Sequence, residues 1–276
     1  MVKLLRSNLS RLIKFKPFYA ALAIQAGVML FITLNSYLQS LKYGSELWAD
    51  MVFSFTVCSI LSAALLAVIC SLFIGADYHN GTIRNKLISG LPRYKIYFAN
   101  LITVMVIAEC MNVAAMLVFY PLTLPLFGGF IEKTNMLLTT FFLGNLTLLV
   151  YASLYTAVAM TTKNTVAALI VTVASLFIMT MAAQYFLSEI NAPLTYTQIV
   201  VNEFGEQVQE TIPNPYRKSE SVLAFFEVLL NIFPSGQVAV LGSDKIVAWQ
   251  AAVSSLCLIG FSGGIGLAVF SKENLK

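Results

Sequence analysis

Few side chains in this sequence are of the types that do chemistry, and they lie far apart along the chain. His79 is the one histidine, which excludes a paired-histidine metal site and a Ser-His-Asp triad built on a second histidine. The cysteines lie in apolar stretches without CxxC spacing and are expected to pack as small hydrophobic residues: Cys58, Cys70, Cys110 and Cys257. The phosphate-binding pattern GxxxxGKS/T does not occur. We therefore predict no enzyme activity, no catalytic residue, no metal site and no cofactor in this chain.

Glu109 is the acidic residue that falls well inside an apolar stretch, roughly midway along it. An isolated charge at the centre of a membrane costs about 2.5 to 3.5 kcal/mol on the insertion scale. This carboxyl group should therefore be neutral, paired or turned toward a cavity. One interpretation places Glu109 on a substrate path, where it couples to protons or contacts a cationic substrate. The other makes it a protonated or hydrogen-bonded packing residue near Asn112.

The composition indicates that these residues are held by membrane-spanning helices. Of 276 residues, 58% are hydrophobic and 11% are charged, against roughly 45–50% and about 25% in soluble domains. A span needs roughly 20 apolar residues, and backbone hydrogen bonding in lipid then requires a helix. Six stretches qualify, at 18–38, 51–74, 98–120, 137–160, 165–187 and 247–270. We predict an all-α membrane protein with six transmembrane helices in a single domain, 1–276.

The distribution of positive charge predicts the orientation of the spans. One set of loops has Asp77 and Glu273 as its only acidic residues and carries these basic residues: Lys3, Arg6, Arg11, Lys14, Lys16, Arg84, Lys86, Arg93, Lys95, Lys163, Lys272 and Lys276. By the positive-inside rule this side is cytoplasmic. We therefore expect a multi-pass protein of a bacterial plasma membrane with both termini in the cytoplasm. A basic surface of the kind that binds nucleic acid is not indicated. A cleaved signal peptide is disfavoured because the first apolar run, 18–38, is too long.

Two segments outside the spans are expected to lie at the membrane surface. In residues 1–17, one helical face gathers Leu4, Leu5, Leu9, Leu12 and Ile13, which predicts an interfacial amphipathic helix broken by Pro17. The alternative for this segment is a basic disordered tail. Residues 188–246 form the one long loop, placed outside the cell and expected to be an irregular surface segment.

Within that loop, the stretch from Val222 to Phe233 is apolar but too short to span a membrane. We predict a re-entrant or interfacial helix that Pro234 and Gly236 stop. An ordinary helix packed across the outer ends of the bundle is the alternative.

The cytoplasmic loop at 75–97 contains the most specific local pattern. Thr82 can cap a short helix, Gly90 suits the left-handed position after its last turn, and Pro92 prevents continuation. The predicted helix carries an apolar stripe and, beside it, polar residues: Ile83, Leu87 and Ile88, with Arg84, Asn85 and Lys86. A short amphipathic helix with positive charge is suited to docking another protein. The alternative is an ordinary connecting loop with a helix cap.

This loop resembles the permease subunits of type-2 ABC transporters, the exporter-like group. Those subunits have six spans, an N-terminal interfacial helix and an acidic-x-x-x-Gly-Thr-aliphatic-Arg-x-x-Leu motif in this loop. The matching residues are Asp77, Gly81, Thr82, Arg84 and Leu87, followed by the basic Arg93. The phrase from Phe233 to Gln237, Phe-Pro-Ser-Gly-Gln, also looks like that family. The outer loop departs from it, since it is longer than the compact re-entrant hairpin expected there.

The resemblance implies that 82–90 is a coupling helix that docks on a separate ATP-binding cassette subunit. ATP and Mg²⁺ would be bound by that partner, and this chain would pair with a second permease as a homo- or heterodimer. The implied docking residues are Asp77, Gly81, Thr82, Arg84, Leu87 and Arg93. The implied activity is export of amphipathic or hydrophobic compounds such as peptides or antibiotics.

Two other classes of protein predict different patterns. An ion-coupled secondary transporter, for which Glu109 is the sole support, would show inverted repeats with broken helices and several polar sites within the spans. An intramembrane enzyme would need paired acids, histidines or a nucleophile dyad there. The sequence displays neither pattern clearly.

Overall fold

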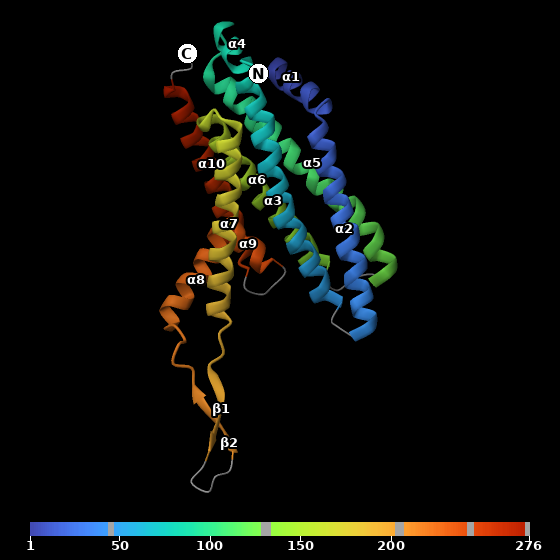
Figure 1. Cartoon of the computed structure of the whole chain (residues 1–276), viewed down its shortest axis with the longest axis vertical. Coiled ribbons are helices and arrows are strands. Elements are labelled where there is room, and N and C mark those ends of the chain that lie inside the picture. Colours follow the sequence, from blue (N-terminus) through green and yellow to red (C-terminus); the bar gives the residue numbers. More distant parts are fainter. Residues whose placement is uncertain (44–46, 128–133, 202–206, 242–245, 274–276) are drawn as a thin grey trace.

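The computed structural model describes residues 1–43, 47–127, 134–201, 207–241 and 246–273. Within these ranges, six helices are long and apolar enough to cross a membrane: α2 (Lys16–Tyr43), α3 (Leu47–His79), α5 (Arg93–Phe127), α6 (Thr134–Thr162), α7 (Thr165–Ile190) and α10 (Ala248–Lys272). They run side by side as one elongated bundle (Figure 1). The predicted spans are confirmed, and the chain is a multi-pass helical membrane protein.

The bundle has a buried centre and an apolar outside. In their most apolar stretches, about half the residues of α3, α5 and α6 are buried, against about a quarter for α2, α7 and α10. The peripheral helices expose large apolar side chains such as Phe31, Phe177 and Phe261. A soluble protein rarely exposes apolar surface in long continuous bands. These outer faces therefore suit contact with lipid.

Small residues let the last span approach the centre closely. A Cβ at Gly266 of α10 would overlap Tyr97 of α5 and Ala157 of α6. One turn earlier in α10, the hydroxyl of Ser262 donates to that of Ser153 at 2.7 Å. Gly260, by contrast, has nothing within 4 Å of where a Cβ would stand. Close helix packing through small residues thus applies to one face of α10 only.

The N-terminal helix α1 (Val2–Ile13) packs against the start of α5. It buries Leu4, Asn8 and Leu12, whereas Ile13 is 66% exposed. The predicted amphipathic helix is therefore present, and Ile13 lies on the part of its apolar face that the bundle leaves uncovered. The chain bends after α1, and Pro17 lies in the first turn of α2, where a missing amide proton costs nothing.

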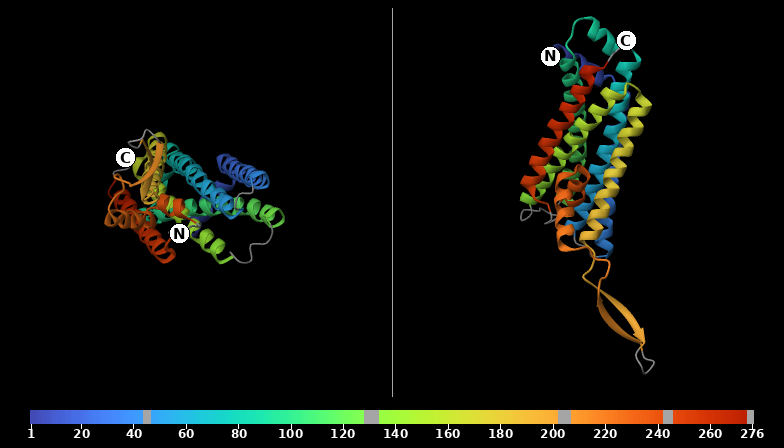
Figure 2. Two further views of the ribbon diagram at one scale, coloured as in Figure 1. Left: turned by 90° about the horizontal axis from the view of Figure 1, so that it is seen from below. Right: turned by 90° about the vertical axis from the view of Figure 1, so that its left-hand side faces the viewer.

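The segment expected to be irregular contains a β-hairpin, so that prediction is wrong. Strands β1 (Thr195–Val201) and β2 (Gln207–Pro213) pair antiparallel, with Thr195 opposite Pro213. Figure 2 shows the hairpin extending beyond the helices. The β-branched residues of β1 favour this strand, although the flanking prolines and acidic residues obscured it in the sequence.

A bent helix pair follows the hairpin. Helix α8 (Glu220–Ile232) and helix α9 (Pro234–Val240) meet at 103°. The predicted apolar helix is confirmed and ends before Pro234, as expected, but a second helix follows at once. That proline starts α9, whose buried residues are Pro234, Ser235, Gly236, Gln237, Val238 and Val240. Helix α9 packs against α3, α6 and α7, and α8 packs against α7 and α10, so the bent pair lies against the spans.

The ends of the bundle differ. At one end lie the N-terminus, helix α4 (Thr82–Ile88) and the C-terminal end of α10; the hairpin lies at the opposite end (Figure 1). We call these the α4 end and the hairpin end. Both termini share the α4 end, as an even number of spans requires.

Candidate functional site

Two glycines define the limits of α4. Gly81 occupies the N-cap position with φ of 64°, and Gly90 follows the helix with φ of 82°, values that favour glycine. The amide of Gly90 donates to Leu87 O at 3.0 Å and that of Leu91 to Lys86 O at 3.2 Å, which is a Schellman ending. The prediction for Gly90 is confirmed. The prediction that the Thr82 side chain caps the helix is wrong, because Thr82 is the first helical residue and its side chain makes no capping bond.

Helix α4 presents a mixed polar and apolar face to its surroundings. Ile83 is 1% exposed and, with Leu87, packs against the core, whereas Ile88 is 74% exposed. Arg84 and Asn85 are also exposed. The predicted stripe of Ile83, Leu87 and Ile88 is therefore divided, because five positions along a helix turn a side chain well away from the first. The outer face consists of Arg84, Asn85 and Ile88, and we call it the α4 face.

A buried ionic cluster supports α4 from within. Asp77, near the end of α3, has a fully buried side chain that pairs with Arg11 of α1 and with Lys86 of α4, whose Nζ lies 3.5 Å from Oδ2. Asp77 was predicted to dock a partner and instead lies inside the chain. Burial lowers the pKa of Arg11 to about 10, which leaves its guanidinium charged at neutral pH. It also lies over the ring of Phe73, 3.8 Å from the centroid, as a cation–π contact.

The polar cluster continues into the spans. The side-chain amide of Asn8 donates to Asn100 Oδ1 at 2.8 Å, and Lys86 Nζ donates to Asn8 Oδ1 at 3.4 Å. Asn100 in turn donates to the sulfur of Met160 at 3.2 Å. Five helices, α1, α3, α4, α5 and α6, thus meet in one network. Asn8 was not predicted, although a polar residue midway between Leu4 and Leu12 on one helical face was a usable signal.

Arg93 has a structural role that the sequence pattern did not indicate. Its guanidinium donates to the carbonyl oxygens of Phe270 at 2.9 Å and Glu273 at 2.5 Å. It therefore satisfies free carbonyl groups at the C-terminal end of α10. Of the residues predicted to dock a partner, Arg84 has an exposed side chain, Asp77 is buried, and the other four are partly covered.

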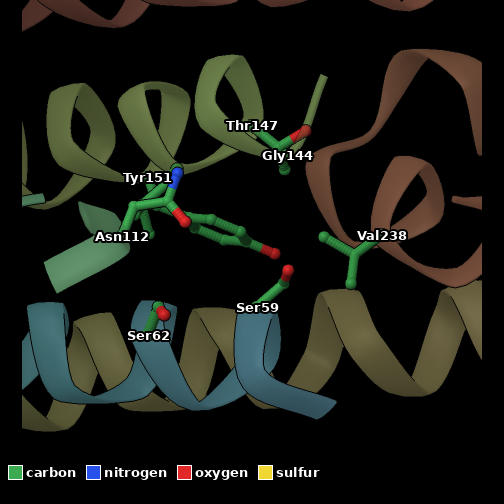
Figure 3. Close-up of a pocket in the computed structure, with 8 residues that line it drawn as sticks. Ser59, Ser62, Asn112, Gly144, Thr147, Tyr151 and Val238 are labelled. Carbon is green, nitrogen blue, oxygen red and sulfur yellow. The ribbon is translucent and has the colours of Figure 1, made fainter. Parts of the chain in front are cut away.

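A second polar region is lined by residues of α3, α5, α6 and α9 (Figure 3). Ser59, Ser62, Asn112, Thr147 and Tyr151 line a cavity of about 10 Å³ there. That volume is about enough for one water molecule. Figure 3 shows hydroxyl and amide groups from different helices facing this space. The region is a polar seam inside the bundle and, in this conformation, too small to hold a larger compound.

Gln237 of α9 connects this seam to α10. Its side chain is fully buried, and its amide donates to Asn231 O at 3.0 Å and to Ala251 O at 3.2 Å. Its carbonyl oxygen accepts from Thr147 at 2.8 Å and from Ser255 at 3.0 Å. One side chain thus joins α8, α9, α6 and α10. The sequence pattern indicated no such role for Gln237, which stands there only as the last residue of Phe-Pro-Ser-Gly-Gln.

No hydrogen bond or ion pair among the described residues joins Glu109 to either polar region. Glu109 is half-buried on α5 and, within the described residues, makes no hydrogen bond or ion pair. Asn112, the neighbour considered for it, donates instead to Asn145 of α6. Glu109 faces an apolar groove of about 490 Å³ whose wall includes Leu22 of α2. Glu109 thus borders an open groove on the outer surface of the bundle, and no hydrogen bond joins it to Asn112 in this structure.

The sequence was compared with models of protein families and with curated proteins, and neither comparison finds a match.

Proposed function

We propose that this chain is the membrane-spanning subunit of a transporter driven by ATP hydrolysis in a separate subunit. The observation that carries the proposal is the α4 face: an exposed Arg84, Asn85 and Ile88 on a short helix whose inner side is fastened to α3 and α1. A docking helix must present side chains outward and resist displacement on its own. Both properties are present in α4.

The buried network supports a route for force. Lys86 of α4 contacts both Asp77 at the end of α3 and Asn8 of α1, and Asn8 bonds to Asn100 of α5. Movement of α4 would therefore be passed to α3 and, through α1, to α5. Helix α3 also contacts α9, so the same movement would reach the polar seam. The partner subunit would bind ATP and Mg²⁺, because no phosphate-binding loop exists in this sequence. Positive charge at the α4 end supports a cytoplasmic position for it.

The remaining parts of the proposal rest on the family resemblance. The chain would work with a second permease and two ATPase subunits in a bacterial plasma membrane, with export as the direction and amphipathic or hydrophobic compounds as cargo. For the ion-coupled alternative, a proton path would need further ionisable groups near Glu109. Among the described residues no hydrogen bond or ion pair links Glu109 to such a group, so we do not favour that alternative.

The double change Arg84→Glu with Ile88→Glu tests the docking role. We expect at least tenfold less ATPase subunit to co-purify with the tagged chain from native membranes in mild detergent, since both exposed side chains would then oppose the partner surface. Quantitative mass spectrometry of the bound proteins measures the loss. Both positions are exposed, so insertion and yield should not change.

Arg6→Glu is the matched control, because Arg6 is an exposed basic residue at the same end but on α1. Its ATPase recovery should equal that of the unmodified chain. Equal recovery with the α4 double variant would remove the docking assignment. The absence of any ATPase from the unmodified preparation would remove the proposed function.

A further inference from the structure

The groove beside Glu109 is wide and almost entirely apolar. Helix α5 supplies most of its wall, including Val113 and Leu117, which are 51% and 71% exposed, and α2 supplies Leu22. Its volume is about 490 Å³, and it is open along the outer surface of the bundle, so a bound molecule would keep one side against the lipid. The carboxyl group of Glu109 is the charged group in this lining.

We propose that this groove binds a lipophilic cation, with Glu109 as its counter-ion. An apolar wall takes the hydrocarbon part of such a molecule, and the carboxylate takes its positive charge. As a statement about cargo the inference rests on the proposed function, whereas the binding itself requires only this chain. The site differs from the polar seam around Gln237, whose cavity of about 10 Å³ has no room for such a compound.

The depth of Glu109 argues for a cation. It lies about 16 residues beyond Arg93, or roughly 24 Å along the helix at about 1.5 Å per residue. An ionised carboxylate in the hydrocarbon region is costly, so a cation that arrives with its own apolar surface relieves that cost. A neutral amphiphile offers the carboxylate no opposite charge, and an anion adds a like charge.

A second copy of this chain is a poor occupant of the groove. Its basic residues would have to reach the depth of Glu109, but Lys and Arg in the spanning helices are confined to their ends: Lys16, Lys42, Arg93, Lys95 and Lys272. No span of a partner copy can therefore bring a cation opposite Glu109. A molecule that enters from the lipid, past the exposed Val113 and Leu117, can.

Two probes of equal shape and opposite charge test the proposal. The purified chain, without any partner subunit, is placed in phosphatidylcholine nanodiscs, and equilibrium binding of tritiated tetraphenylphosphonium and of tetraphenylborate is measured. The unmodified chain should bind the cation saturably and the anion only at the level of empty nanodiscs. Glu109→Gln should weaken cation binding at least about tenfold, because tetraphenylphosphonium has no hydrogen-bond donor and the change removes its Coulombic attraction to the carboxylate.

Two further variants separate charge from shape. Glu109→Asp keeps the carboxylate and should bind the cation within a few-fold of the unmodified chain. Ala114→Phe keeps Glu109 but fills the groove, and should abolish cation binding. All variants are compared at equal size-exclusion profile and equal thermal midpoint, so that loss of binding is not loss of fold.

Unchanged cation binding in Glu109→Gln would overturn the proposal. Equal saturable binding of tetraphenylborate would also overturn it, since the groove would then be a lipid pocket without charge selection. Because no ATPase is present, failure here leaves the α4 docking experiment untouched. Loss of ATPase co-purification, conversely, leaves the binding result valid.

Discussion

Replacing Asp77 with alanine should destabilise the folded chain by about 3 kcal/mol, since breaking a buried ion pair leaves uncompensated charge. The Asp77 side chain is fully buried, whereas those of Lys86 and Arg11 are 13% and 32% exposed, which places the effect at the lower end of the usual 3–5 kcal/mol. Such a loss corresponds to a fall in the thermal midpoint of roughly 6–12 °C for a chain of this size. Thermal unfolding of the purified chain in detergent measures it.

Glu273→Gln is the matched control for Asp77. It removes another carboxylate at the α4 end, the partner of Lys163 at 3.1 Å, but this pair is more exposed. Surface pairs contribute about 0–1 kcal/mol, so the midpoint should hardly move. Replacing the whole cluster, with Asp77→Leu, Arg11→Met and Lys86→Met together, should restore most of the stability. An equally small effect for Asp77→Ala and Glu273→Gln would mean that the cluster does not hold α4.

Gly236→Ala is expected to have the second large effect, because the backbone of α8 passes directly over Gly236. A Cβ there would stand 2.5 Å from the carbonyl oxygen of Leu230 and 2.7 Å from its Cα. These are backbone atoms and cannot rotate away, so α8 and α9 must separate and the Gln237 contacts weaken. We expect a loss of about 3 kcal/mol, near the upper end for overpacked sites. The thermal midpoint in detergent and the rate of limited proteolysis at α8 measure it.

Gly260→Ala is the control, because this glycine-to-alanine change should leave the stability of the folded chain unchanged or increase it. Gly260 lies within α10, and nothing stands within 4 Å of its Cβ position. Alanine favours a helix over glycine by up to about 1 kcal/mol, so this variant should be as stable as the unmodified chain or more so. A Gly236→Ala chain that matched it would contradict the close approach of α8 to α9.

The spans could be predicted from the sequence because their signal is local. Long apolar runs and the need to satisfy the backbone in lipid leave helices as the one solution. Helix α4 was also predictable, since Gly90 and Pro92 mark its end. Helix α9 was not. Pro234 and Gly236 read as breakers, and their actual roles, a first helical residue and a close contact with Leu230, depend on how α8 lies in the bundle.

In the candidate site, too, some features were predictable from the local sequence and others depend on the folded arrangement. A charged residue in a loop is expected to be exposed to solvent. Arg84 is exposed, but Asp77 is buried and Arg93 is partly covered. The partners of those two, Arg11 and the carbonyl groups at the end of α10, lie far away along the chain, so only the folded arrangement reveals them. Glu109 was recognisable as a costly charge in an apolar run, but the groove beside it is formed by two helices and has no local signature.

The long-range polar contacts of α1 also bear on biogenesis. Asn8 bonds to a residue 92 positions later, so at about 5–20 residues per second a ribosome needs roughly 5 to 20 s to supply that partner. The partner of Arg11 becomes available earlier, because Asp77 follows it by 66 positions at the end of the second span. The N-terminal segment can therefore be held first by α3, and its docking is completed only when the third span supplies Asn100.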